Sequence, residues 1–129
     1  MVNAALRMER VVAIVFAVSL IGACAVHIAD LLWHGWFPYR FAPRPLSVYW
    51  TSLTFFDALA AFLLLCSMRI GLFLTLAIIG SDVAFNLFAR FWLGLHLHPL
   101  ALLLQIVFLI AVVGAIVYAQ RSEVITRTI

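Results

Sequence analysis

Four long apolar stretches, joined by short polar connections, constrain the fold of this chain more than any other feature. They cover residues 11–33, 47–66, 70–92 and 99–119, and each has about the 20 residues that an α-helix needs to cross the hydrocarbon core of a bilayer. Of the 129 residues, 67% are hydrophobic and 10% are charged, whereas soluble domains have roughly 25% charged residues. An ordinary water-soluble domain is therefore excluded. We predict an all-α integral membrane protein, a four-transmembrane-helix bundle with short loops that forms a single transmembrane domain over residues 1–129.

The segments that join the four apolar stretches also fit a bundle of four helices. The first one contains three prolines, which prevent the preceding helix from continuing: Pro38, Pro43 and Pro45. Ser47 is expected to cap the N-terminus of the second helix. Residues 67–69 leave so little chain between the second and third stretches that these two helices should form a hairpin. Pro99 opens the fourth helix, where proline is tolerated, and residues 120–129 are expected to form a polar tail.

The arginines predict the orientation of the bundle in the membrane. One side of the membrane would hold Arg7, Arg10, Arg69, Arg121 and Arg127, and the other would hold Arg40, Arg44 and Arg90. Because basic residues concentrate on the cytoplasmic side, both termini are expected to be cytoplasmic. The chain has no lysine, and its arginines are scattered rather than clustered, so we predict no nucleic-acid partner. This composition is typical of a GC-rich genome and favours the inner membrane of a bacterium.

The first stretch also resembles a bacterial lipoprotein signal. Two arginines and an apolar run precede the residues Ile21, Gly22, Ala23 and Cys24. Cleavage before Cys24 would turn this cysteine into a lipidated N-terminus and leave three spans. However, the residues after Cys24 stay apolar as far as Trp33, where a processed lipoprotein usually continues into a polar tether. We therefore favour the four-span form.

Polar side chains inside the apolar stretches fall at matching depths, counted at 1.5 Å per residue from the outer end of each helix. Asp57 and Asp82 each lie about 15 Å deep, close to the midplane of the membrane. Every helix places one hydrogen-bonding side chain about 10 Å deep: His27, Thr54, Asn86 and Gln105. Asp30 and Arg90 lie within about 5 Å of the outer edge, where they could form an ion pair.

Three helices present these polar groups on one face each, because residues three or four positions apart share a helix face. The shared faces are His27, Asp30 and His34; Trp50, Thr54 and Asp57; and Asp82, Asn86 and Arg90. The inner half of every span has no ionisable group. A pore or carrier needs polar groups along its whole path, so this gradient favours a blind pocket that opens at the outer side. Its candidate ligand-binding residues are Asp57, Asp82, His27, Asn86, Gln105, Thr54, Asp30 and Arg90.

The two midplane aspartates allow a functional and a structural interpretation. Desolvation and mutual repulsion both favour the protonated form of a carboxyl group, so we expect at least one of Asp57 and Asp82 to be neutral. The pair could share a proton and accept a cation, or act as acid and base. Alternatively, each aspartate could simply hydrogen-bond a neighbouring helix and stabilise the bundle by about 1 kcal/mol per contact.

Metal and haem sites are disfavoured. Imidazole and carboxylate ligands could come from His27, Asp30, His34, His96 and His98, but no metal-binding motif is present and interfacial histidines are often only solvated. We predict no metal and no cofactor. Cys24 and Cys66 differ by about 20 Å in depth, which is too far for a disulfide.

Small residues gather on a second face of the third span, turned away from Asp82: Ala77, Gly80, Ser81 and Ala84. Such a face lets helices approach closely and could bind a second copy of the chain or another membrane protein. We favour the alternative that the first or fourth span packs there.

These features favour a non-enzymatic membrane protein, either an accessory subunit or a binder of an amphiphilic or cationic small molecule in the outer pocket, with membrane lipid as its surroundings. The alternative is a membrane enzyme that uses Asp57 and Asp82 for acid–base chemistry on a lipid-soluble substrate. An ion or proton carrier is disfavoured by the apolar inner half.

Overall fold

The chain folds into four long helices, as expected from its apolar stretches. The computed structural model describes the backbone of residues 2–127 and the side chains of residues 7–121. The helices are α1 (Val2–His34), α2 (Arg44–Cys66), α3 (Met68–Phe91) and α4 (Pro99–Arg127), and there is no strand in the described part of the chain. Each helix is long and apolar enough to cross a membrane. The prediction of an all-α, four-helix protein is confirmed, and the four spans indicate a multi-pass membrane protein.

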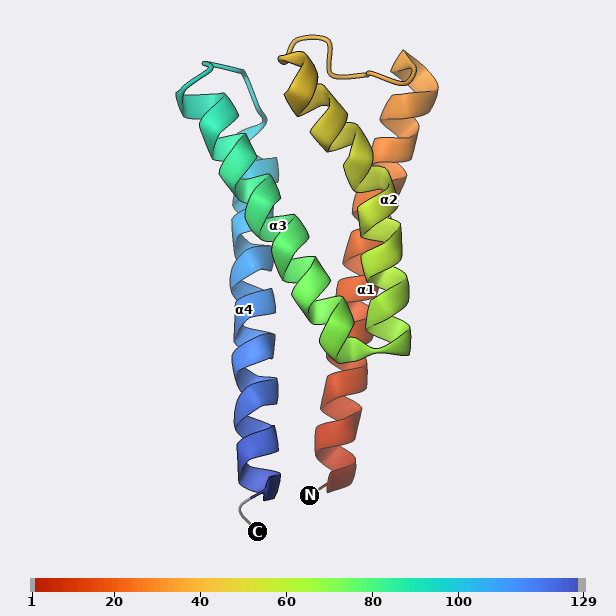
Figure 1. Cartoon of the computed structure of the whole chain (residues 1–129), viewed down its shortest axis with the longest axis vertical. Helices are drawn as coiled ribbons and strands as arrows, with labels where there is room; N and C mark the ends of the chain where they lie inside the picture. The colour runs from red at the N-terminus through yellow and green to blue at the C-terminus, as the bar shows by residue number, and fades with distance from the viewer. Residues whose placement is uncertain (1, 128–129) are drawn as a thin grey trace.

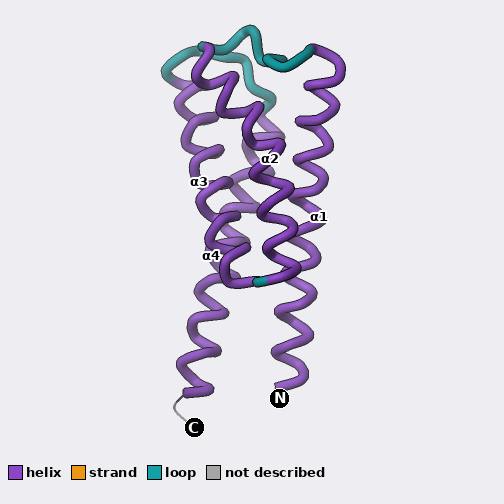
Figure 2. Tube along the Cα trace, turned by 45° about the vertical axis from the view of Figure 1, so that its right-hand side comes forward, coloured by secondary structure: helices purple, strands orange, loops and turns teal. Residues whose placement is uncertain are grey.

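The helices run antiparallel in sequence order. Figure 1 shows the α1–α2 and α3–α4 loops at one end of the molecule, which we call the loop end, and both termini at the opposite, terminal end. Only Ser67 separates α2 from α3, which confirms the predicted hairpin. In Figure 2, α1 and α4 both continue past the α2–α3 turn toward the terminal end.

Three helix boundaries differ from the predictions. The helix α2 begins at Arg44 with Pro43 as its N-cap residue and a proline in its first turn, so the prediction of Ser47 as the N-cap is wrong. Ser47 instead lies buried inside α2. The helix α1 begins well before residue 11, and α4 includes most of the predicted tail. Polar residues next to an apolar span therefore continue the helix, because nothing in those segments breaks it.

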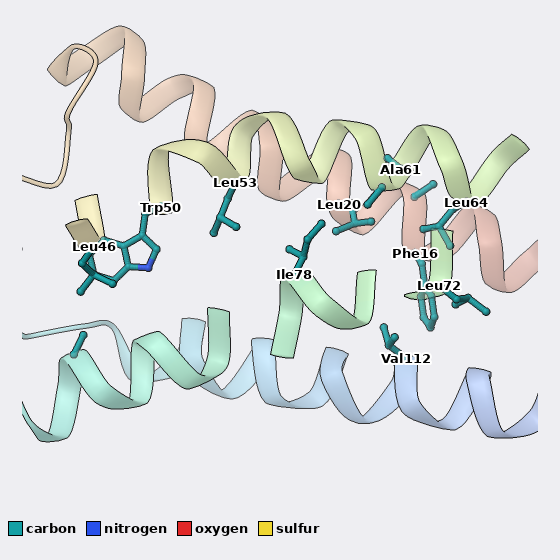
Figure 3. Packing of buried hydrophobic residues seen from close by; sticks show 13 residues of the cluster. Phe16, Leu20, Leu46, Trp50, Leu53, Ala61, Leu64, Leu72, Ile78 and Val112 are labelled. Carbon is teal, nitrogen blue, oxygen red and sulfur yellow. The ribbon is translucent and has the colours of Figure 1, made fainter. Parts of the chain in front are cut away.

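The apolar core runs along the contacts between consecutive helices. Figure 3 shows Phe16 and Leu20 of α1, Leu64 of α2, Ile78 of α3 and Val112 of α4 within this cluster. The α1 residues Phe16 and Leu20 come before Cys24, so the α1 segment that signal cleavage would remove contributes to the core.

The bundle is open between its first and last helices. Helix α1 packs on α2, α2 on α3, and α3 on α4, while α1 and α4 share no comparable interface. The two helices meet at the rings of Phe16 and Phe108, whose centroids are 5.2 Å apart. Large apolar side chains cover the outside of all four helices, for example Val18, Phe62, Phe73 and Ile110. A hydrocarbon solvent suits this surface.

Candidate functional site

A cleft of about 690 Å³ lies between α1 and α4, where the bundle is open. Both helices supply its sides, and α2 and α3 supply its floor. Val26 and Leu104 line the cleft and are also exposed at the molecular surface, so the cleft opens sideways between the two helices. Its polar lining residues are Ser19, His27, Asp57, Asp82 and Gln105, and the other lining residues are apolar.

His27 of α1 lies at the centre of a chain of polar side chains that runs toward the loop end. Its Nε2 atom is 3.9 Å from Oδ2 of Asp57 on α2. Its Nδ1 atom is 2.8 Å from the hydroxyl of Tyr39 in the α1–α2 loop, and that hydroxyl donates to Oδ2 of Asp30 over 3.0 Å. The turn of α1 between His27 and Asp30 places both side chains on one face, and the loop folds back so that Tyr39 reaches them.

The hydroxyl of Tyr39 keeps its proton. Burial raises the pKa of Tyr39, and the hydrogen bond to the Asp30 carboxylate raises it further. The phenol is therefore a neutral hydrogen-bonding group over the physiological pH range.

Asp82 of α3 belongs to a second network that joins three helices. Gln105 Nε2 of α4 donates to Asp82 Oδ2 over 2.8 Å. Asn86 Nδ2 donates to Asp82 Oδ1 over 3.2 Å and to Gln105 Oε1 over 2.9 Å. Asn86 Oδ1 in turn accepts a hydrogen bond from Trp50 Nε1 of α2 over 2.9 Å. Asp82 thus makes the interhelical hydrogen bond that the structural interpretation expected of it.

A smaller cavity of about 150 Å³ lies beyond the cleft at the loop end. His27, Asp82 and Gln105 line both spaces, and Asn86 and Tyr39 line the smaller one. His27, Asn86 and Gln105, which were predicted to lie at a similar depth, therefore line the same cavity. The larger space, however, opens between α1 and α4 and not at the outer side of the bundle.

The predicted ion pair between Asp30 and Arg90 is not formed. Asp30 accepts the hydrogen bond from Tyr39, and Arg90 Nη1 donates to the backbone carbonyl of Leu97 over 2.8 Å. The α3–α4 loop folds over Arg90 and offers it a nearer acceptor, so Arg90 stays outside the cleft.

Thr54 is buried in α2 but does not line the cleft. Its backbone carbonyl accepts a hydrogen bond from the thiol of Cys24 over 3.2 Å. Cys24 is buried, Cys66 is exposed and both are free, as the depth difference predicted. Within the side chains that the structure describes, no three His, Cys, Asp or Glu residues come together in a way that could hold a metal ion.

The small-residue face of α3 is largely uncovered, whereas the sequence favoured packing of the first or fourth span on it. Ala77 and Ala84 are exposed, and a Cβ atom added to Gly80 would meet no other atom within 4 Å. Ser81 is bonded to the hydroxyl of Tyr49 on α2 over 2.7 Å. In the described part of the chain α1 packs mainly on α2, and α4 bonds to α3 through Asp82 and Asn86, away from these small residues.

Tyr39 and Trp50 were not among the candidate pocket residues, although both make central hydrogen bonds. Trp50 shares a helix face with Thr54 and Asp57, and this spacing could have indicated it. Tyr39 lies in a loop, where helical counting gives no depth, and only its position among prolines and aromatic residues marked it as interfacial.

Comparisons of the chain with protein-family models, with curated proteins and with solved structures found no match.

Proposed function

We propose that this protein binds a single-chain amphiphile with a positively charged head in the cleft between α1 and α4. The observation that carries the proposal is the composition of the lining: two aspartates line the cleft with Ser19, His27 and Gln105, its other lining residues are apolar, and none of the described residues that line it is an arginine. A buried carboxylate needs a compensating partner, and a cationic head placed beside Asp57 and Asp82 would supply one. The protein would act as a binding or accessory protein rather than as an enzyme.

The dimensions of the cleft suit one hydrocarbon chain. On α1 its lining runs from Val15 to His27, which corresponds to about 18 Å of helix. This length is about half of a hydrocarbon core of roughly 30 Å. A volume of about 690 Å³ is within the usual range of small-molecule sites, roughly 300 to 1,000 Å³.

The orientation follows from the arginine distribution. With both termini in the cytoplasm, the loop end faces the outer side of a bacterial inner membrane, and the polar end of the cleft is nearer to that side. The head of the amphiphile would then enter from the outer leaflet and lie near the midplane, and its chain would point into the inner leaflet toward the pair of Phe16 and Phe108.

Photolabelling tests the proposal directly. The protein is reconstituted in liposomes with a primary alkylamine that carries a photoreactive diazirine in its chain, and labelled peptides are mapped by mass spectrometry. We expect labels on cleft residues of α1 and α4, such as Leu20 and Leu104, that an excess of dodecylamine removes and that dodecanol removes far less. Labels spread evenly over the lipid-facing surface, without competition, would contradict the proposal.

Two alanines of α1 provide a matched pair of variants. Ala23 lines the cleft, whereas Ala25 is exposed on another side of the same helix. Ala23→Phe would fill part of the cleft and should abolish the competed labelling. Ala25→Phe adds the same side chain outside the cleft and should leave the labelling unchanged.

A membrane enzyme is the second candidate, and one observation favours it. The contact between His27 and Asp57 places an imidazole and a carboxyl group together at the cleft, as general acid–base chemistry requires. Asp82 is held by two amide donors, so the reacting pair would be His27 and Asp57. Such an enzyme should introduce deuterium from D₂O into a copurified lipid-soluble molecule, and Asp57→Asn should stop the exchange.

A further inference from the structure

We infer that His27 presents a hydrogen-bond acceptor to the cleft, so that the cleft selects amphiphiles whose cationic head carries N–H donors over those with a quaternary ammonium head. This inference rests on the proposed function and specifies the chemistry of its ligand.

The hydroxyl of Tyr39 has a single proton. That proton is donated to Oδ2 of Asp30, so the phenol oxygen must accept at its other short contact, the one to Nδ1 of His27 at 2.8 Å. Nδ1 must then carry a proton. When the ring is neutral it has only one N–H, and Nε2 of His27 then holds a lone pair.

The Nε2 atom that holds this lone pair lies beside Asp57. Nε2 faces Oδ2 of Asp57 at 3.9 Å, which is too long for a direct hydrogen bond. The Asp57 side chain is only 5% exposed, and among the described residues no side chain or backbone group donates a hydrogen bond to it. Asp57 and His27 both line the cleft. When the Asp57 carboxyl is ionised, two acceptors therefore lie side by side with no donor between them.

Asp82 differs from Asp57 in this respect. Both of its carboxyl oxygens accept hydrogen bonds, from Asn86 and from Gln105. It therefore has less need of a donor from the ligand. The acceptors that lack a donor are thus Asp57 and Nε2 of His27.

A primary ammonium group has three N–H donors, enough to reach Asp57 and Nε2 of His27 together. A trimethylammonium group has the same charge and no N–H, so both acceptors would stay unpaired, which is costly for buried groups. We expect the primary amine to compete at least about tenfold better than the quaternary one.

The test compares dodecylamine with dodecyltrimethylammonium as competitors of the photoreactive alkylamine in liposomes. Wild-type protein should prefer dodecylamine. Tyr39→Phe removes the hydroxyl that fixes the imidazole proton on Nδ1 and should clearly reduce the preference for dodecylamine, while labelling by the probe continues. Tyr49→Phe is the matched control, because its hydroxyl bonds to Ser81 away from the cleft, and it should keep the wild-type preference.

The outcomes separate the two proposals. If neither cationic competitor displaces the probe from wild-type protein, the proposed function fails. If both displace it equally well, or if Tyr39→Phe keeps the full preference, the cationic site stands and the inference about His27 is overturned.

A second readout needs no ligand. Nitrogen-15 NMR of the imidazole rings, with His27 assigned through a His27→Gln variant, reports which ring nitrogen carries the proton. Wild-type protein should show protonated Nδ1 and unprotonated Nε2, and Tyr39→Phe should shift the population toward protonated Nε2. A wild-type His27 protonated on Nε2 alone would overturn the inference.

Discussion

The rings of Phe16 and Phe108 meet edge to face, with their centroids 5.2 Å apart and their planes at 78°. One ring comes from α1 and the other from α4, and both line the cleft near its apolar end. They connect two helices that otherwise have little contact, and in the proposed binding mode they would limit how far a hydrocarbon chain can extend toward the terminal end.

Replacing one ring of this pair should lengthen the cleft. Phe108→Ala removes the ring from the apolar end, and we expect octadecylamine to gain as a competitor in photolabelling relative to dodecylamine. Phe62 is exposed on α2 and does not line the cleft, so Phe62→Ala should leave the ranking of the two amines unchanged. A ranking unaffected by Phe108→Ala would show that the ring pair does not limit chain length.

Gly71 should tolerate no side chain. A Cβ atom built there would overlap the backbone of Leu64, lying 2.6 Å from its Cα atom, because α2 and α3 approach closely beside their one-residue turn. Gly71→Ala should lower the free energy of unfolding by about 1 to 3 kcal/mol, measured by denaturation in mixed micelles. Gly80→Ala, in the open part of the same helix, should be neutral or stabilising, since alanine favours helix.

Gln105 should stabilise the attachment of α4. Its amide donates to Asp82 and accepts from Asn86, so Gln105→Met loses two contacts with α3. We expect the free energy of unfolding to fall by about 1 kcal/mol, as is usual for interhelical hydrogen bonds in membranes. Gln120→Met, at an exposed position of α4, is the control. Equal stability of the two variants would mean that the network contributes nothing measurable.

Tyr39 should make the folded protein sensitive to alkaline conditions. Its pKa in the folded protein is raised by burial and by Asp30, while in the unfolded chain tyrosine ionises near pH 10. The stabilisation is therefore complete below about pH 10 and is lost as the pH rises through the higher folded value. Thermal unfolding across this range should show wild-type protein losing stability relative to Tyr39→Phe. Parallel curves for the two proteins would contradict the assignment.

The helices could be predicted from the sequence because long apolar runs leave few other structures in a membrane. Their ends were harder to place. Ser47 looked like a cap, but Pro43 and Pro45 start the helix earlier, and the polar residues near both termini continue their helices. The opening between α1 and α4 depends on how the helices tilt against one another, which apolar periodicity does not specify.

The candidate site was partly accessible to the same reasoning. Counting along helices placed His27, Asp57, Asp82 and Gln105 at depths where the structure brings them to one cleft. The predicted partner of Asp30 was wrong because both of the real partners involve loops: Tyr39 for Asp30, and the carbonyl of Leu97 for Arg90. The conformation of a loop depends on how the helices pack, and no periodic pattern in the sequence indicates it.

The missing interface between α1 and α4 has a consequence for how occupancy would be controlled. A molecule that enters through this side arrives by diffusion in the plane of the bilayer, so its mole fraction among the lipids, and not its concentration in water, sets the saturation of the protein. Diluting proteoliposomes with buffer should then leave a strongly partitioned occupant in place, whereas fusing them with empty vesicles should release it.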